Sequence, residues 1–94
     1  MLRFKHNVHI FQITVGATPL LLIPMNPNRK ALLVYNNSGG TVEILSNSGG
    51  TYGSGIPILT GNTYVNDYSP EGEYWIVGSG AGLDVRVEED TQLA

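Results

Sequence analysis

The chain has 94 residues, a net charge of −3 and no cysteine. This length allows one domain with one core, and the lack of cysteine excludes disulfides and thiolate metal sites within it. Charged residues make up only 14% of the sequence, against about 25% in a typical soluble domain. Because charged groups are depleted at interface cores, this composition is typical of a surface covered by neighbours, and equally of a glycine-rich β-protein with an ordinary surface.

The charges are unevenly distributed along the chain. The first 30 residues contain four basic residues and no acidic one, whereas the rest contain one basic and eight acidic residues. Phosphate binding needs a basic face, so we expect no nucleic-acid partner. The two oppositely charged parts could meet between subunits or pair within one subunit. No signal-peptide pattern is visible and the apolar runs, such as residues 20–23, are too short to span a bilayer, so we expect synthesis in a cytoplasm and no membrane partner.

Strand signals recur along the chain, each bounded by Gly, Pro, Asn or Ser, and helix signals are almost absent. In chain order, the pattern predicts strands over residues 7–15, 18–23, 30–36, 41–45, 56–59, 63–66, 73–77 and 83–88. In the first strand the apolar positions change parity at Phe11, which predicts a bulge. In the last strand Leu83, Val85 and Val87 alternate with charged residues, which predicts one buried and one solvent-facing side.

The connections between these strands are rich in glycine. The string Asn-Ser-Gly-Gly-Thr occurs at residues 37–41 and again at 47–51. It predicts the same turn at both ends of one short strand, because glycine adopts positive φ without steric cost. About eight short strands at this spacing predict an all-β fold, a jelly-roll-like or Greek-key β-sandwich. We divide the chain into an N-terminal arm (1–6), the β-sandwich domain (7–88) and a mobile C-terminal tail (89–94).

Residue types that carry catalysis or bind metals form no recognisable site. His6 and His9 are the two histidines, and residues i and i+3 of a strand face opposite sides, so they do not form a metal pair. The acidic residues at 67–73 match no calcium loop. The glycine-rich segment 78–82 lies between two strands, whereas phosphate loops precede a helix. We therefore expect no catalytic residue, no cofactor, no metal and no enzymatic activity.

Aromatic residues in the second half of the chain are candidates for binding. Tyr74 and Trp75 are adjacent on one predicted strand, so one faces the core and the other faces outward. An outward Trp75 would be a candidate contact residue for a protein partner. A carbohydrate-binding module is the alternative from another class of function, since exposed rings could stack on sugars. Its candidate residues are Tyr52, Tyr64, Tyr68 and Trp75.

The two ends of the chain supply the other candidate interface residues, which are Leu2, Arg3, Phe4, Lys5, Glu88 and Glu89. The alternation of apolar and basic residues in the arm suits insertion of the apolar side chains into a neighbour while the basic ones meet acids. Those acids could belong to a partner or to the tail. A cysteine-free sandwich of this size has little stability to spare and open sheet edges to cover, so we expect self-assembly.

Four segments carry a resemblance to a known group of proteins. They are residues 26–38 (NPNRKALLVYNNS), 55–59 (GIPIL), 73–77 (EYWIV) and 85–89 (VRVEE). Together they resemble the small β-domains of tailed-phage structural proteins, including capsid decoration (cement) proteins and head or tail fibre modules. Within the first segment, Arg29 is expected to close the loop before the central strand, and Asn36 and Asn37 to leave it by an Asx-type turn.

The resemblance implies a function in the virion. A cement protein binds where subunits of the major capsid protein meet and stabilises the shell by mass action. The resemblance to decoration proteins on capsid three-fold axes implies a homotrimer, with the arm taking part in assembly. A tail or fibre adaptor is the alternative within the same class.

Overall fold

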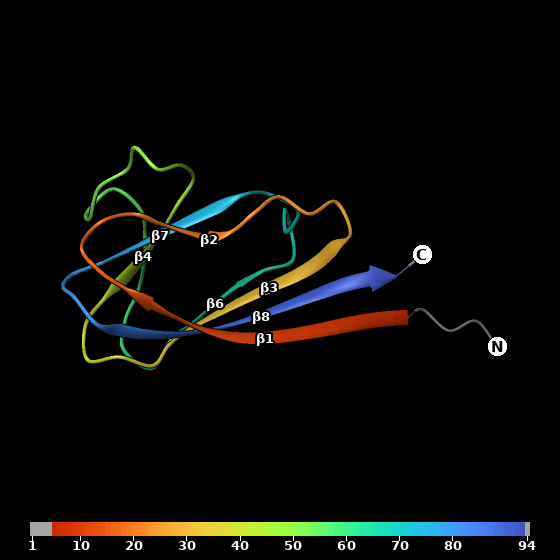
Figure 1. Ribbon diagram of the computed structural model, residues 1–94, viewed down its shortest axis with the longest axis horizontal. Coiled ribbons are helices and arrows are strands. Elements are labelled where there is room, and N and C mark those ends of the chain that lie inside the picture. The colour runs from red at the N-terminus through yellow and green to blue at the C-terminus, as the bar shows by residue number, and fades with distance from the viewer. Residues whose placement is uncertain (1–4, 94) are drawn as a thin grey trace.

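The computed structural model describes residues 5–93 and contains eight strands (Figure 1). They are β1 (Lys5–Val15), β2 (Leu20–Ile23), β3 (Arg29–Asn36), β4 (Val42–Leu45), β5 (Ile56–Ile58), β6 (Thr63–Asn66), β7 (Tyr74–Gly78) and β8 (Leu83–Leu93). Antiparallel pairing joins them into two four-stranded sheets, in the orders β1-β8-β3-β6 and β2-β7-β4-β5. This arrangement is that of a jelly roll, so the predicted all-β sandwich is confirmed. In the described part of the chain, no helix is long and apolar enough to cross a membrane.

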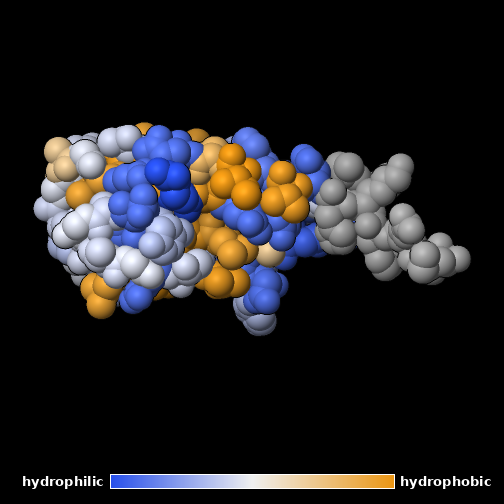
Figure 2. Space-filling view, turned by 90° about the horizontal axis from the view of Figure 1, so that it is seen from below, coloured by the Kyte–Doolittle hydropathy of each residue, from blue (hydrophilic) through white to orange (hydrophobic). Residues whose placement is uncertain are grey.

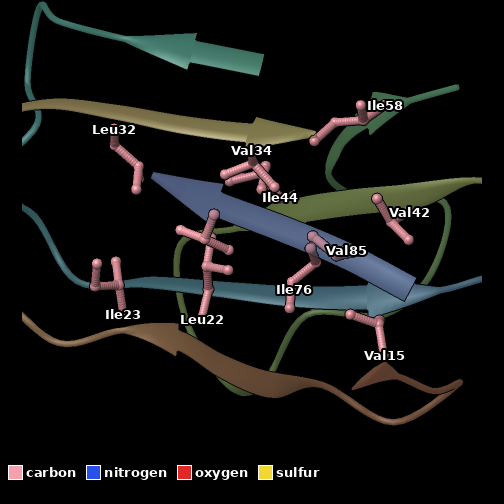
Figure 3. Close-up of a cluster of buried hydrophobic side chains, with 11 residues drawn as sticks. Val15, Leu22, Ile23, Leu32, Val34, Val42, Ile44, Ile58, Ile76 and Val85 are labelled. Carbon is pink, nitrogen blue, oxygen red and sulfur yellow. The ribbon is translucent and has the colours of Figure 1, made fainter. Parts of the chain in front are cut away.

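The core lies between the two sheets (Figure 3). Alternate residues of each strand point inward, and most of those side chains are β-branched or leucine, which suit a pleated surface. Each fully buried aliphatic side chain contributes about 1.5–3 kcal/mol to folding. The buried cluster consists of Val15, Leu22, Ile23, Leu32, Val34, Val42, Ile44, Ile58, Ile76, Val85 and Val87.

β1 runs without the predicted bulge. It pairs with β8 in one continuous antiparallel register over its whole length. Odd-numbered residues from 11 to 15 pack against or within the core, and even-numbered residues from 8 to 14 are exposed. The prediction was wrong because it assigned Val8 and Ile10 to the core, whereas these apolar residues lie on the solvent-facing side of the strand.

β8 ends at Leu93 and not at Glu88. Residues 89–93, predicted as a mobile tail, continue the strand and pair with the start of β1. The prediction followed from the position of these residues at the end of the chain, but the ladder is made by main-chain groups, which pair whatever side chains they carry. The arm is also shorter than predicted, because Lys5 and His6 belong to β1. The arm residues that lie outside the described part of the chain are Met1, Leu2, Arg3 and Phe4.

A buried arginine connects β3, β8 and two loops. Arg29 is 0% exposed. Its Nε donates to Glu89 Oε2 at 2.9 Å, its Nη1 to the carbonyl oxygens of Pro70 at 2.8 Å and Gly72 at 3.0 Å, and its Nη2 to that of Pro24 at 2.5 Å. Buried charges are stable only when paired and hydrogen-bonded in this way. Arg29 therefore closes the loop before the central strand, as predicted.

Asn36 organises the turn that follows β3. Its Oδ1 accepts hydrogen bonds from the main-chain N–H and the hydroxyl of Ser38, at 3.1 and 2.6 Å. Its Nδ2 donates to the carbonyl oxygens of Gly40 and Ile58, both at 2.8 Å. The predicted Asx-type turn is confirmed, and the same side chain ties this turn to the end of β5.

Candidate docking surface

The outward face of the sheet β1-β8-β3-β6 carries apolar residues on three of its strands. The register places Ile10 opposite Glu88, Glu88 opposite Leu33, and Leu33 opposite Val65, so that one row of side chains crosses all four strands. The next row crosses the same strands in the same order, through Gln12, Arg86, Tyr35 and Thr63. We name the apolar members of this surface the apolar face, which consists of Val8, Ile10, Leu33, Tyr35 and Val65.

Most of the apolar face is open to solvent. Ile10 is 66% exposed, Val65 56%, Val8 55% and Tyr35 38%. Single exposed apolar residues are ordinary, but a group on one face marks a contact site more often than chance. A hollow of about 230 Å³ lies within the group, lined by Ile10, Leu33, Tyr35, Thr63, Arg86, Val87 and Glu88.

One end of the apolar face is bordered by an internal ion pair. Arg86 Nη2 lies 2.9 Å from Asp84 Oδ2, and Asn37 Nδ2 donates to the same oxygen at 2.8 Å. The Arg86 guanidinium, and then the Asn37 amide, lower the pKa of Asp84 to about 2. The carboxylate in turn raises the pKa of Arg86. The two charges satisfy each other, so this end of the face carries no net charge.

The other end of the apolar face is acidic. Glu88 and Asp90 are two residues apart on β8, so their side chains lie on the same side of the sheet. Burial raises the pKa of Glu88, and the negative charge of Asp90 raises it further. Asp90 Oδ1 is buried and has no hydrogen-bond partner among the described residues. A partner that carries a donor or a positive charge would stabilise this end of the face.

The structure separates the two glutamates that the sequence predicted as interface residues. Glu88 lies on the apolar face, in the row that contains Ile10. Glu89 points the opposite way, because adjacent residues of a strand face opposite sides. Its Oε2 accepts from Arg29 at 2.9 Å and its Oε1 lies 3.9 Å from His9 Nδ1. Glu89 therefore has an internal role, and Lys5, the described residue of the predicted arm set, lies in β1.

Trp75 lies on the other sheet. Tyr74 packs against the core, and Trp75, the next residue, stands on the outward side of β7, with Leu21 and Leu45 opposite it on β2 and β4. Its Nε1 donates to Glu73 Oε2 at 2.9 Å. The predicted opposite orientation of the two aromatic residues is correct, but Trp75 shares no surface with Glu88.

The aromatic residues considered for sugar binding lie on different elements. Tyr68 is 97% exposed in the loop after β6, and Tyr52 is in the loop between β4 and β5. Tyr64 is half-buried in β6, where its hydroxyl accepts from Asn66 Nδ2 at 3.2 Å and burial raises its pKa. Within residues 5–93, no three His, Asp or Glu residues lie close enough together to hold a metal ion.

The sequence did contain a signal for the apolar face. Residues 7–15 hold apolar side chains at both even and odd positions, a pattern typical of a strand with a buried partner on each side. The prediction removed this pattern by introducing a bulge. Without the bulge, apolar residues at both even and odd positions indicate a strand that is apolar on its solvent-facing side as well as on its buried side.

Comparison with known proteins identifies a fold and not a family. No protein-family model matches the chain, and no curated protein matches it. A solved structure does. It is a protein of Bacillus endospore appendages, described as a novel family of disulfide-linked pili, and it aligns with a TM-score of 0.58 over 97% of this chain and 89% of that chain, at 18% sequence identity. At this identity the likeness supports the β-sandwich fold alone.

Proposed function

We propose that this protein is a non-enzymatic structural subunit of a virion, a capsid cement protein that docks on the shell through its apolar face. One observation carries the proposal, namely that Val8, Ile10, Tyr35 and Val65 are exposed together on one face of a sheet. The segments that resemble phage decoration proteins supply the identity of the assembly. Docking of a small rigid domain adds contact area between shell subunits, which stabilises the shell by mass action.

The energetics suit a docking role. Covering an exposed aliphatic side chain contributes about 1.5–3 kcal/mol before the cost of association. The acidic end at Glu88 and Asp90 would fix the orientation of the docked protein, because it would attract a basic group of the partner and repel an acidic one. We expect the capsid partner to present a basic residue beside an apolar patch.

A pilus-like filament is a second candidate assembly, favoured by the likeness to the endospore appendage protein. The chain contains no cysteine, so a filament of this protein would be held together by non-covalent contacts. The two candidates differ in what the isolated chain does. A filament subunit polymerises alone, whereas a cement protein needs a shell.

Co-sedimentation of the purified chain with capsid shells that lack it tests the proposal. Val65→Lys places a charge at the β6 end of the apolar row and is expected to weaken shell binding at least about tenfold, which corresponds to about 1.4 kcal/mol. The control is Tyr68→Lys, which adds the same charge to a side chain that is 97% exposed in a neighbouring loop. Control binding should equal that of the original chain.

Two results would contradict the cement proposal. One is equal binding of the two lysine variants, which would show that the apolar face takes no part. The other is the appearance of filaments in electron micrographs of the isolated chain, which would favour the second candidate.

A further inference from the structure

β1 is the one long sheet edge in the described part of the chain. The edges of the two sheets are β1, β6, β2 and β5. β5 has three residues and contains Pro57, and β6 has four residues. β2 has four residues, lies between Pro19 and Pro24, and pairs with β7 in an irregular register. β1 has 11 residues in an unbroken register. Short strands, prolines and bulges are the devices by which proteins prevent edge pairing, and β1 has none of them.

Beyond its first residue, Lys5, β1 carries no lysine or acidic residue to protect its edge. Residues 7–15 contain no Asp, Glu, Lys, Arg or Pro. Asn7, Val8, His9 and Ile10 are consecutive and all exposed, so this half of the strand is uncovered on both faces. Figure 1 shows that the start of β1 and the end of β8 project beyond the other strands. An uncharged edge with exposed apolar residues is a template for another strand.

Main-chain hydrogen bonds between β8 and the residues at the two ends of β3 show which main-chain groups of β1 are free. Gln92 donates its N–H to Asn28, and Asp84 accepts from the N–H of Asn37. Even-numbered residues of β8 therefore direct their main-chain groups toward β3, and odd-numbered ones toward β1, because the direction alternates along a strand. The register pairs odd with odd residues. The N–H and C=O groups of Val8, Ile10, Gln12 and Thr14 consequently point away from β8, along the open edge.

A groove lies next to this edge, between β1 and β2. It has a volume of about 410 Å³ and is lined by His9, Phe11, Leu22, Ile23, Pro24, Met25, Asn26, Arg29 and Glu89. Met25 is 69% exposed beside it. Figure 2 views the molecule from the side of β1 and shows apolar side chains exposed between polar ones. A strand added to β1 would direct every second side chain to the side of this groove.

We infer that β1 pairs with the β1 strand of a second copy of this chain, antiparallel and about a two-fold axis. The eight strands β6-β3-β8-β1 and β1-β8-β3-β6 would then form one continuous sheet. Full overlap of two strands that each run from Lys5 to Val15 places Ile10 at the axis and Val8 opposite Gln12 of the partner. In this register, Phe11 of each copy faces the groove of the other.

The strand that pairs with the open edge belongs to a second copy because β1 is complementary to itself. Its length is matched by no other edge in the described residues, so only a second β1 pairs along its whole length. An isologous two-fold contact needs a surface that tolerates its own image. The absence of charge between residues 7 and 15 meets this condition, since no like charges come together.

The edge can be blocked without breaking the fold. In Ile10→Pro the lost N–H is one that points to the open edge, and proline is tolerated at such edge positions. We expect this variant to be monomeric by sedimentation, with an unchanged β-type circular dichroism spectrum. The matched control is Ile10→Ala, which removes the apolar side chain and keeps the N–H, and it should remain dimeric.

Spin labels on the otherwise intact chain test the register independently of the proline variant. The chain has no cysteine, so Gln12→Cys or Thr14→Cys introduces one label per copy. With Ile10 at the axis, the Cα–Cα distance between copies is about 14 Å at position 12 and about 28 Å at position 14, from a rise of about 3.4 Å per residue and a strand spacing of about 4.8 Å. These distances would support the pairing.

Three results would overturn the inference. They are a monomeric original chain at millimolar concentration, a dimer or trimer that persists in Ile10→Pro, and label distances that do not increase from position 12 to position 14. The inference does not depend on the proposed function. Val65→Lys lies on β6 at the opposite edge of the sheet, so it should abolish shell docking and leave the dimer intact, whereas Ile10→Pro should abolish the dimer.

Discussion

Arg29 is the position at which a single substitution should lower the free energy of unfolding most. Arg29→Ala would leave Glu89, whose side chain is only 15% exposed, without its cation. It would also remove the donor from three carbonyl oxygens, those of Pro24, Pro70 and Gly72. Breaking a buried ion pair from one side costs about 3–5 kcal/mol, and each unsatisfied buried acceptor adds about 1 kcal/mol or more unless water replaces the donor.

We therefore expect Arg29→Ala to lower the free energy of unfolding by at least about 4 kcal/mol, from a total of about 5–15 kcal/mol for a domain. Urea denaturation, followed by the fluorescence of the single tryptophan Trp75, measures this loss. The double variant Arg29→Met with Glu89→Leu removes both charges and should recover part of it. Arg86→Gln is the control at an exposed ion pair and should change stability little. A loss below about 1 kcal/mol in Arg29→Ala would refute the conclusion that Arg29 holds β3, β8 and the two loops together.

The other predictions concern charge and glycine. The pKa of Asp84, measured by NMR, should be about 2 and should rise toward its ordinary 3.8 in Arg86→Gln, because the guanidinium is the main cause of the shift. Folded Glu88 binds its proton more tightly than the unfolded chain does, so its contribution to stability is present below the ordinary pKa of 4.5 and is lost as the pH rises through the raised folded pKa. Denaturation at a series of pH values should show this decline, and Glu88→Gln should abolish it. Gly55→Ala should lower the melting temperature, since its new Cβ would collide with a carbonyl oxygen of β4, whereas Gly39→Ala meets nothing within 4 Å and should not.

The strands that could be predicted are those in which side-chain alternation and turn residues agree. Leu83, Val85 and Val87 face inward as their spacing requires, and Pro57 lies on an edge strand. The end of β8 could not be predicted in this way. Its acidic side chains suggest solvent, and the reason that they lie in a strand, the pairing with β1 and the bond from Arg29 to Glu89, spans the whole chain.

The two copies of Asn-Ser-Gly-Gly-Thr show how local prediction fails for turns. In the first copy, the turn is made by the residue before it, Asn36, whose amide reaches into the sandwich. In the second copy, Asn47 itself accepts from Gly49 N–H at 2.8 Å. No glycine of either copy has positive φ, which in the described residues occurs at Gly53, Gly61 and Gly82. Identical local sequences therefore turn differently, because one is joined to the core and the other is not.

Pairing through the open edge should also affect docking through the apolar face, because β1 contributes to both. A two-fold axis perpendicular to the sheet keeps the outward sides of both copies on the same side. Val8 and Ile10 of one copy would then lie beside those of the other, and the two apolar faces would merge across the pairing. Pairing would double the apolar area without exposing new residues, so the dimer should bind a shell with higher avidity than the monomer, and Ile10→Pro should weaken shell binding more than Ile10→Ala.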